Sequence, residues 1–386
     1  MYPTMNQLLS TVYDTRASGY FLFNKTKPAK KQTETLYEIE NNVANAMKKT
    51  LPQEAYTFIS DNVDLRNYQN ILFTTDRKAY VDNLDIDNLR VIVNSKKINN
   101  IRYINKHLRH VNCLLPDAGF YIGRFNDLWE RKRNIYKTIG PKLGRLIWFL
   151  DFILNRFLPK IKYIGKIYFW LTRGKFHVVS RSEVLGRMIY CGFEVIDTKT
   201  IDGITYFIAL KTKPPSKHKT PTYHPLITLQ RIGKDGKMIG VYKMRTMFPY
   251  SEYLQDYVVK MNGYNEYGKP ARDFRLTGWG KIFRKLWLDE LPQIINFIKG
   301  DLALVGVRPL SKARFKELPE EVQEARIKFK PGLIPPYVAL NMPDSFGNIE
   351  AERIYMAEKV MHPFRTDMKF FFMAVFNVLT GKIRSA

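Results

Sequence analysis

The sequence has few residues that could build a disulfide framework or a zinc cluster. Its 386 residues include two cysteines, Cys113 and Cys191, both in apolar runs, and six histidines without metal-ligand spacing. Two cysteines exclude a multi-bridge scaffold and a multi-cysteine metal site, so we expect buried thiols in a reducing compartment. The N-terminus lacks a basic region followed by an apolar run, so no signal peptide is expected.

Acidic residues are also scarce. There are 36 Asp and Glu against 62 Lys and Arg, which gives a formal net charge of +26. The chain is 45% hydrophobic and 14% aromatic, which excludes intrinsic disorder because this apolar mass can offset the entropy of ordering. The charge predicts an anionic partner: a nucleic acid, a phosphorylated substrate or an acidic membrane surface.

No uncharged apolar run reaches the length of about 18 residues that a spanning helix needs. The segment that comes closest is LIWFLDFILNRFLPKIKYIGKIYFWLT, residues 146–172. Its aromatic residues Trp148, Phe149, Tyr168 and Trp170 are typical of contact with a membrane surface, although helices packed on a protein core produce the same pattern. Eight cations in or beside the segment are expected to meet anionic headgroups: Lys142, Arg145, Arg156, Lys160, Lys162, Lys166, Arg173 and Lys175.

Residues 211–225 are rich in proline, lysine and small polar residues and indicate a linker between domains 1–210 and 226–386. In the first domain, short β-like runs alternate with helical stretches, which predicts an α/β sheet. We expect strands at 70–74, 89–94 and 119–123, helices at 101–114 and from Ser180 to Tyr190, and a hairpin of 193–197 with 204–210.

This order is similar to the C-terminal half of a class I methyltransferase sheet. Such enzymes need a glycine-rich loop that lets the backbone approach the cofactor, and no G-x-G occurs before the linker. We therefore expect a Rossmann-like, degenerate methyltransferase-like domain without a nucleotide-binding loop, carrying a membrane-associating insertion at residues 141–175.

The second domain opens with a predicted hairpin, in which residues 226–233 and 238–247 flank Lys234-Asp235-Gly236-Lys237. Lys243 and Arg245 are two residues apart on one strand, so they share a face and could hold a diphosphate. A solvated strand end is the simpler interpretation of that pair.

A helix is predicted from Asp289 to Gly300 by an apolar stripe at Leu291, Ile294, Ile295 and Ile298. Spacing alone favours Asp289 as its N-cap. However, a carboxylate pair at a helix start can also hold a divalent metal or act as a nucleophile, and nearby cations can gather phosphate oxygens. The cations just upstream are Arg275, Arg284 and Lys285.

Four motifs together resemble the bacterial sugar transferase family, the monotopic phosphoglycosyl transferases that start polysaccharide assembly on polyprenyl phosphate. The resemblance covers about residues 222–386. The motifs are Lys243-x-Arg245-Thr246-Met247, Asp273-x-Arg275-x-Thr277, Gly280-x3-Arg284-Lys285-x2-Leu288-Asp289-Glu290-Leu291-Pro292-Gln293-x2-Asn296-x3-Gly300-Asp301 and Val305-Gly306-x-Arg308-Pro309.

The resemblance implies a mixed α/β catalytic domain with interfacial amphipathic helices, bound peripherally at the cytoplasmic face of the bacterial inner membrane. It implies that Asp289 attacks the β-phosphate of a UDP-sugar, that UMP leaves, and that polyprenyl phosphate takes the sugar phosphate. Glu290 and Mg²⁺ would assist, with both carboxylates near the metal. The implied phosphate or substrate contacts are Lys243, Arg245, Arg275, Arg284, Lys285, Arg308 and Pro309. Neither the sugar nor the oligomeric state follows from the motifs.

The chain departs from the family pattern at three places. The family's Pro-Arg-Pro is Val307-Arg308-Pro309 here. The apolar re-entrant helix that usually precedes the hairpin is replaced by the linker, and Leu333-Ile334-Pro335-Pro336-Tyr337 differs from the usual run after Pro-Gly. Our hypothesis is that residues 146–171 replace the missing anchor. The stretch 364–379 resembles the family's closing helix and is a second candidate for interfacial contact.

Three other functions agree with parts of the sequence. A nucleic-acid-binding protein would explain the charge, but no binding motif is present and the lysines are spread over both domains. A working methyltransferase would need the glycine-rich loop. An inactive scaffold would not need Asp289 and Glu290. We therefore expect no nucleic-acid partner.

Overall fold

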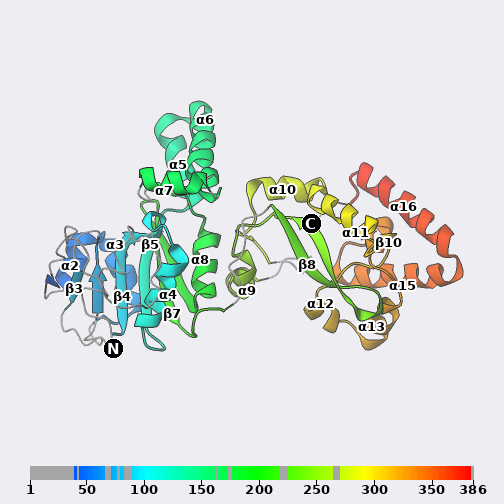
Figure 1. Cartoon of the computed structure of the whole chain (residues 1–386), viewed down its shortest axis with the longest axis horizontal. Helices are drawn as coiled ribbons and strands as arrows, with labels where there is room; N and C mark the ends of the chain where they lie inside the picture. The colour runs from blue at the N-terminus through cyan, green and yellow to red at the C-terminus, as the bar shows by residue number, and fades with distance from the viewer. Residues whose placement is uncertain are drawn as a thin grey trace, which may run out of the picture. The chain divides into compact units, whose positions relative to one another are not determined.

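The computed structural model describes residues 39–40, 43–65, 71–75, 79–81, 89–161, 163–172, 176–217, 225–263 and 270–383. The chain forms two compact units (Figure 1). The N-terminal unit comprises residues 1–221 and 249–254, and the C-terminal unit comprises residues 222–248 and 255–386. The predicted linker at 211–225 falls partly outside the described residues, which omit 218–224.

The N-terminal unit is built on a mixed sheet with strand order β1-β3-β2-β4-β5-β7-β6. Strands β2, β4 and β5 run parallel, and β7 lies antiparallel between β5 and β6. The predicted strands and the hairpin are confirmed. The strand bounds are β1 Ile39–Glu40, β2 Ile71–Thr74, β3 Ala79–Val81, β4 Val91–Lys97, β5 Phe120–Phe125, β6 Phe193–Ile201 and β7 Ile204–Lys211.

The hairpin turn forms because Asp202 and Gly203 both adopt positive φ, at 49° and 74°, as a tight turn between twisted strands requires. Helices α2, α3, α4 and α8 accompany the sheet, and α2 and α3 share a buried apolar cluster with β2, β4 and β7. Their bounds are α2 Val43–Thr50, α3 Gln53–Asn62, η2 Ile98–Asn100, α4 Ile104–Leu114 and α8 Arg181–Tyr190.

Helix α8 begins as predicted, because the Ser180 hydroxyl accepts the Glu183 backbone N–H. The middle of α8 packs against η6 (Ser251–Leu254). In the sequence η6 lies between β9 and α9, yet it belongs to the N-terminal unit. A Cβ on Gly186 would lie 2.3 Å from the carbonyl oxygen of Tyr250, so only glycine allows this contact. The Arg187 guanidinium lies 4.4 Å from the centre of the Tyr250 ring.

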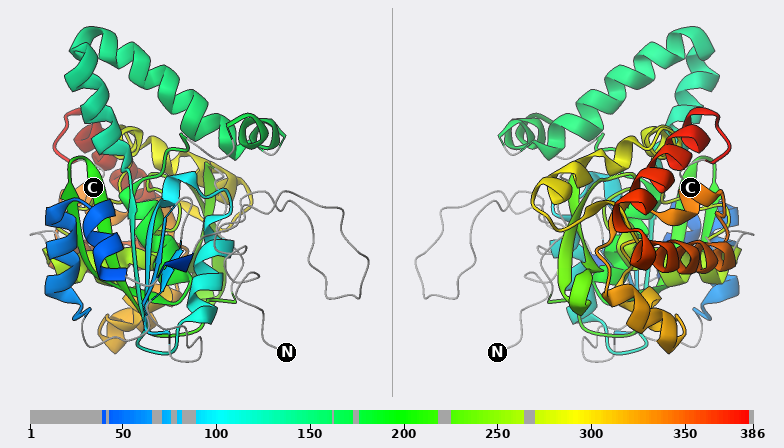
Figure 2. Two further views of the ribbon diagram at one scale, coloured as in Figure 1. Left: turned by 90° about the vertical axis from the view of Figure 1, so that its left-hand side faces the viewer. Right: turned by 90° about the vertical axis from the view of Figure 1, so that its right-hand side faces the viewer.

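The insertion between β5 and α8 is helical and projects from the sheet (Figure 2). It contains α5 Leu128–Ile139, α6 Pro141–Phe152, η3 Ile153–Phe157, η4 Leu158–Lys160 and α7 Ile164–Thr172. Of the predicted membrane-contact residues, Phe149 and Trp170 are 59% and 76% exposed. Trp148 and Tyr168 are half-buried, and the Tyr168 hydroxyl donates to Asn155.

The prediction that all eight cations of this region face lipid is wrong for two of them. Arg156 is 4% exposed and lies 3.1 Å from the buried Glu183 carboxylate, and Lys160 turns toward the same carboxylate at 3.5 Å. A buried carboxylate recruits cations from any element within reach, because an unpaired buried charge is costly. Lys162, Arg173 and Lys175 lie outside the described residues.

The C-terminal unit combines two small sheets with helices, so the chain as a whole is mixed α/β. Strands β8 Leu226–Ile232 and β9 Met238–Met244 form the predicted hairpin, with a short turn η5 Lys234–Gly236. Strands β10 Ala303–Val305 and β11 Gly332–Ile334 pair in parallel. The helices are α9 Gln255–Asn262, α10 Gly278–Lys285, η7 Leu288–Gln293, α11 Ile294–Ile298, α12 Lys312–Lys316, α13 Glu320–Ile327, α14 Pro336–Leu340, α15 Ser345–Met361 and α16 Pro363–Leu379.

The core of this unit lies between β10, β11, α14, α15 and α16. Asn377 of α16 donates to the carbonyl groups of Val338 and Ala339, which fixes α14 against α16. Among the described residues, no helix combines the length and hydrophobicity needed to cross a bilayer.

Candidate active site

The predicted carboxylate pair lies on a short helix that is fastened to the strand carrying Lys243. Asn296 is fully buried and makes this connection with both ends of its amide. Its Oδ1 accepts the Tyr242 backbone N–H at 2.9 Å, and its Nδ2 donates to the Gly240 carbonyl at 2.8 Å. Asn296 therefore fixes the η7–α11 segment, which carries Asp289 and Glu290, against strand β9.

The polypeptide reaches η7 through a tight reversal after α10. Thr277 caps α10 by accepting the Gly280 N–H at 2.9 Å, and the same hydroxyl donates to the Thr246 carbonyl. At the other end of α10, Trp287 adopts the left-handed conformation, with φ 60°, which is rare for a bulky residue. The Trp287 carbonyl then accepts the Glu290 N–H at 3.2 Å. This reversal sets the direction in which Asp289 and Glu290 leave the backbone.

The interpretation of Asp289 as a helix N-cap is wrong. The residue is the second of the 3₁₀ segment η7, and the N-cap position belongs to Trp287. The Asp289 side chain is fully buried, yet neither carboxylate oxygen accepts a hydrogen bond from the described residues. An N-cap carboxylate would accept a hydrogen bond from a backbone N–H with one of its oxygens. Asp289 instead keeps both oxygens available for chemistry.

One cation stands beside both carboxylates. Lys243 Nζ lies 3.0 Å from Asp289 Oδ2 and 2.9 Å from Glu290 Oε1. This placement offsets the electrostatic repulsion between two adjacent negative charges. Lys243 therefore lies beside the two carboxylates, and its role in binding phosphate stays a prediction.

Arg284 adds a second cation near the dyad. Its Nε donates to Thr246 Oγ1 at 3.1 Å. Burial lowers the pKa of Arg284, and the charges of Asp289 and Asp273 oppose that shift because they favour the protonated guanidinium. Arg284 is therefore a cation held in the field of the Asp289 carboxylate.

The other predicted cations lie in different surroundings. Arg275 is buried and makes a bidentate contact with Asp273, at 2.8 and 2.7 Å, plus a bond to Gln255. Its guanidinium is already engaged by protein groups. Arg245 follows β9 and donates its backbone N–H to Pro225, and Lys285 is exposed at the end of α10.

Arg308 meets the dyad region through Tyr337, a residue that motif comparison did not assign to the site. The Arg308 guanidinium lies 5.3 Å from the centre of the Tyr337 ring. Burial raises the pKa of the Tyr337 phenol; the charge of Arg308 opposes this shift and that of Glu290 adds to it. The phenol is thus near both Arg308 and the dyad. The signal for Tyr337 was its position in the unusual run after Pro331-Gly332.

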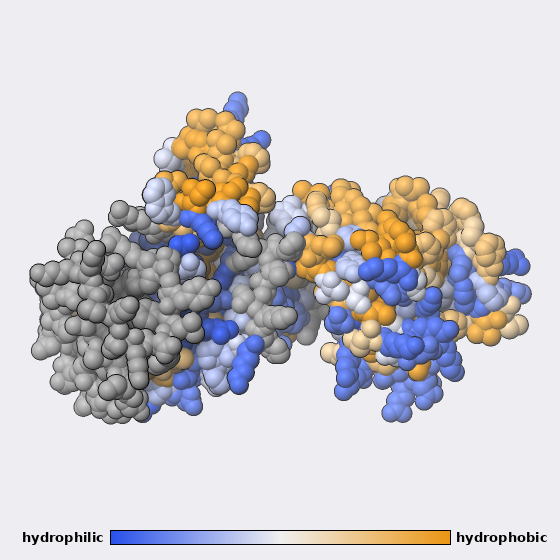
Figure 3. Space-filling view, viewed as in Figure 1, coloured by the Kyte–Doolittle hydropathy of each residue, from blue (hydrophilic) through white to orange (hydrophobic). Residues whose placement is uncertain are grey.

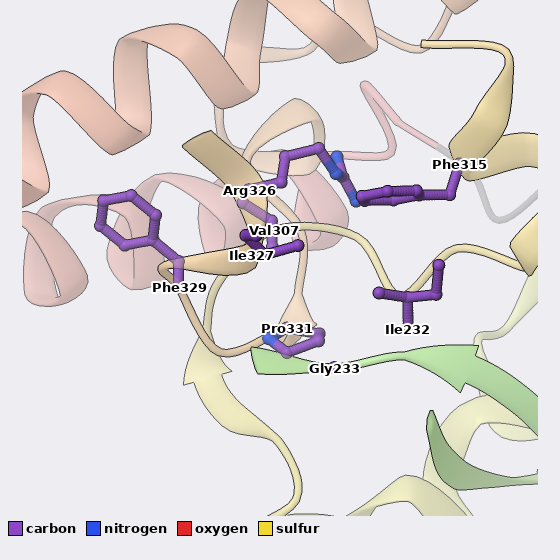
Figure 4. Close-up of a pocket in the computed structure, with 8 residues that line it drawn as sticks. All are labelled: Ile232, Gly233, Val307, Phe315, Arg326, Ile327, Phe329 and Pro331. Carbon is purple, nitrogen blue, oxygen red and sulfur yellow. The ribbon is translucent and has the colours of Figure 1, made fainter. Parts of the chain in front are cut away.

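The backbone of Arg308 is fixed by a buried ion pair. Its N–H donates to Glu352 at 2.8 Å, and its carbonyl accepts from Arg326, which is itself paired with Glu352. Burial and repulsion from Arg308 lower the pKa of Arg326 to about 10. Figure 4 shows Arg326 beside Phe315 in a small pocket that Pro331 also lines. Pro309 directly follows Arg308.

The carboxylates suit a hard divalent cation. Among the described residues there is no group of three or more His, Cys, Asp and Glu side chains that could bind a metal by themselves. Mg²⁺, however, is commonly held by one or two carboxylates together with substrate phosphates. Asp289 contributes two buried oxygens without hydrogen-bond donors, and Glu290 is adjacent. The donor set therefore fits Mg²⁺ bound jointly with a phosphorylated ligand.

A buried carboxylate beside Lys243 and Arg284 is an arrangement that could bind and react with phosphate groups. The comparison with known proteins gives its class: residues 204–381 match the family model of the bacterial sugar transferases. This part of the chain is therefore similar to that family. The match begins inside β7 of the N-terminal unit.

The individual relatives share a shorter segment. The chain is 35% identical over 109 residues to galactosyl transferase CpsE of Streptococcus agalactiae serotype III, covering 28% of this chain and 24% of that protein. It is 35% identical over 109 residues to undecaprenyl-phosphate galactose phosphotransferase of Salmonella typhimurium, covering 27% and 23%. Exopolysaccharide production protein ExoY of Sinorhizobium fredii is 35% identical over 109 residues, covering 27% and 48%. The matches thus span between a quarter and a half of those relatives.

Proposed function

We propose that the protein transfers a sugar 1-phosphate from a UDP-sugar to a polyprenyl phosphate, such as undecaprenyl phosphate, through a covalent phosphoglycosyl-aspartate. The observation that carries this proposal is Asp289, a fully buried carboxylate without a hydrogen-bond donor and 3.0 Å from Lys243. The relative from Salmonella typhimurium, which carries undecaprenyl phosphate in its name, supports the choice of acceptor. The product would begin the assembly of a polysaccharide or glycoconjugate.

The reaction divides into two displacements at one phosphorus. In the first, an Asp289 oxygen forms a bond to the β-phosphorus, and the bond to the UMP oxygen breaks with its electron pair leaving on UMP. In the second, an oxygen of polyprenyl phosphate bonds to the same phosphorus and the Asp289 carboxylate departs. A covalent intermediate of this kind replaces one difficult step with two easier ones.

The dyad's surroundings favour Asp289 as the nucleophile. Hydrogen bonds to a carboxylate stabilise its charge and reduce its reactivity, and Asp289 accepts none from the described residues. Glu290 is half-exposed and shares Lys243 with Asp289. Lys243 thus provides a positive charge beside both carboxylates, which would reduce their repulsion of an anionic donor.

We propose that Asp289 and Glu290 hold Mg²⁺ together with the diphosphate. The ion would supply charge neutralisation at the leaving phosphate. Lys243, Arg284 and Arg308 would contribute fixed positive charge to the same end, and Tyr337 would orient Arg308 by stacking. The exposed Lys285 and the remaining predicted contacts, Arg245 and Pro309, would meet more distant parts of the substrates.

A lipid-linked acceptor calls for contact with a membrane, and the C-terminal unit has suitable surfaces. The apolar stripe predicted on η7 and α11 is exposed: Leu291, Ile294, Ile295 and Ile298 are 43–78% accessible. Helix α16 adds further exposed residues, including Phe364 at 78% and Leu379 at 81%. Figure 3 shows apolar residues along α10, α11 and α16. We propose that these helices lie in the interface, at the cytoplasmic face, where nucleotide sugars are made.

For the N-terminal unit we propose a degenerate Rossmann-like role without cofactor binding. The support is topological: β7 inserts antiparallel between β5 and β6, as in the methyltransferase sheet that the element order resembles. Failure to bind S-adenosylmethionine in calorimetry agrees with this proposal, and measurable binding contradicts it.

The proposed reaction is tested by UMP release from a panel of UDP-sugars in the presence of Mg²⁺ and polyprenyl phosphate. We expect one or a few sugars to give UMP in amounts that far exceed the enzyme. The Asp289→Asn variant should release none above background, whereas Lys281→Gln, an exposed change on α10, should match the wild type. Equal rates for the wild type and Asp289→Asn would refute the nucleophile.

A further inference from the structure

The insertion of the N-terminal unit carries a set of strongly exposed apolar side chains. We define the insertion patch as Leu146, Phe149, Phe157, Ile167, Trp170 and Leu171, which are 55–76% exposed. Figure 3 shows apolar residues gathered over α6 and α7. A group of neighbouring exposed apolar side chains marks an interaction site, whereas apolar residues scattered singly over a surface need no explanation.

The patch is mounted rigidly on the unit's core. Asp151 of α6 makes a bidentate contact with Arg131 of α5, with bonds of 2.8 and 2.5 Å. Arg156 and Lys160 reach Glu183 of α8, which is fully buried. The insertion is therefore not free to fold its apolar side chains onto its own helices, and the patch needs a partner from outside.

The charges around the patch select among possible partners. Residues 128–172 contain ten Lys and Arg against two acids, and both acids are ion-paired, Glu130 with Arg133 and Asp151 with Arg131. Lys142, Arg145 and Lys166 are exposed on the same helices as the patch. A second copy of the chain would bring the same positive charge and be repelled. Aromatic and aliphatic side chains bordered by cations instead match the headgroup boundary of an anionic bilayer.

We propose that the insertion patch docks into the headgroup region of an anionic lipid bilayer. The N-terminal unit thus has a membrane contact of its own, separate from the apolar helices of the C-terminal unit. The buried Glu183 cluster acts as the positioning device that keeps the patch outward. This assignment does not depend on the transferase reaction.

A local fluorescent probe in the full-length chain tests the proposal. In a Cys113→Ser background, an environment-sensitive label is attached at Ile167→Cys on the patch, or at Lys137→Cys on α5 as the matched exposed control. The remaining thiol, Cys191, is buried and its pKa is raised to about 12 by burial, so it does not react. The fluorescence intensity and emission wavelength of the label are recorded with phosphatidylcholine vesicles that contain or lack phosphatidylglycerol.

We expect the label at position 167 to brighten and shift to the blue on phosphatidylglycerol vesicles and to be quenched by acyl-brominated lipid. The label at position 137 should change little. The proposal is overturned if the fluorescence of the label at position 167 does not change, or if it changes equally at positions 167 and 137. A shift that grows with protein concentration without vesicles assigns the patch to a second copy and also overturns it. An equal response on neutral vesicles removes the role of anionic lipid.

A double variant provides an independent measure. Phe149→Glu with Trp170→Glu places charge on two exposed positions, so folding should be retained and circular dichroism unchanged. We expect at least a tenfold weaker association of full-length protein with anionic vesicles, and unchanged UMP release from detergent-solubilised substrates. Unaltered vesicle binding contradicts the proposal. Should the wild type release no UMP at all, the reaction fails while the vesicle result still stands.

Discussion

The fully buried carboxylates of Glu183 in the N-terminal unit and Asp289 in the C-terminal unit differ in the hydrogen bonds that they accept. Glu183 accepts hydrogen bonds from Arg156 at 3.1 Å and Arg187 at 2.9 Å, with Lys160 at 3.5 Å. Asp289 has Lys243 at 3.0 Å, but its oxygens accept no hydrogen bond from the described residues. The first is saturated with donors, and the second is not. Saturation makes a buried charge structural, whereas an unsatisfied buried carboxylate is available to a substrate or a metal.

The pKa of Glu183 supports this contrast. Burial alone would raise it, but Lys160, Arg156 and Arg187 hold it well below its usual range. The carboxylate therefore stays ionised through the physiological range. The same cluster lowers the pKa of Lys160 to about 7, through burial first and then repulsion from Arg156. The ion pairs of Glu183 with Arg156 and Lys160 thus serve to hold the insertion to α8.

The largest effect should come from exchanging the unsatisfied carboxylate for an amide. Asp289→Asn keeps the size of the side chain and removes the nucleophile, so UMP release should fall by about 10⁶-fold, the cost of removing the nucleophile of another covalent catalyst. Stability should fall little, because the carboxylate accepts no hydrogen bond from the described residues and Lys243 keeps Glu290 as its partner. UMP release and urea denaturation, measured on the same preparation, check both expectations. A stability loss as large as that of Glu183→Gln would remove the contrast.

The corresponding change at Glu183, from carboxylate to amide, should lower the free energy of unfolding rather than the reaction rate. Glu183→Gln leaves Arg156, Arg187 and Lys160 without their buried counter-charge, which costs about 3–5 kcal/mol. We expect the N-terminal unit to unfold at a lower urea concentration and the insertion to become protease-sensitive. The rate of UMP release per folded molecule should stay within a few-fold of the wild type. Unchanged urea midpoints would show that Glu183 does not hold the insertion.

Removing the cation shared by the dyad should have an intermediate effect. Lys243→Met is expected to slow UMP release by about 10²–10³-fold, a typical cost of losing one fixed electrostatic contact. Lys243→Arg, which keeps the charge, should restore part of the rate. A Lys243→Met rate within a few-fold of the wild type would argue against a role for the shared ion pair.

The smallest effect concerns pH and a buried neutral group. Burial, with repulsion from His110 and Lys96, lowers the pKa of His107 to about 3, below the unfolded value of 6.5. The unfolded chain binds the proton more readily below pH 6.5, so stability is lost as pH falls from 6.5 toward 3. At pH 5 the loss should be about 2 kcal/mol. His107→Gln should flatten this acid slope in urea titrations, and an unchanged slope would assign it elsewhere.

Much of this arrangement could be predicted from local sequence. The two hairpins follow from Asp202-Gly203 and Asp235-Gly236, since these dipeptides tolerate the positive φ of a turn. The start of α8 follows from Ser180. The dyad follows from a dense motif whose members are close along the chain.

The errors have a common origin in contacts that sequence spacing does not encode. The sequence places Arg156 with the lipid-facing cations because its partner Glu183 lies 27 residues away. It favours Asp289 as a cap because nothing in the sequence indicates that Trp287 is left-handed. It does not point to Tyr337 because the contact of this ring with the Arg308 guanidinium, 5.3 Å from its centre, forms only in the folded chain.

The most direct test of the central claim is capture of the covalent intermediate. Full-length protein is incubated with Mg²⁺ and a UDP-sugar labelled in the β-phosphate, without polyprenyl phosphate, then digested and analysed by mass spectrometry. The account predicts one equivalent of UMP per active site and a sugar phosphate on the peptide containing Asp289. The adduct should disappear on adding polyprenyl phosphate and be missing in Asp289→Asn. UMP formed only when the acceptor is present, with no adduct on Asp289, would contradict the account.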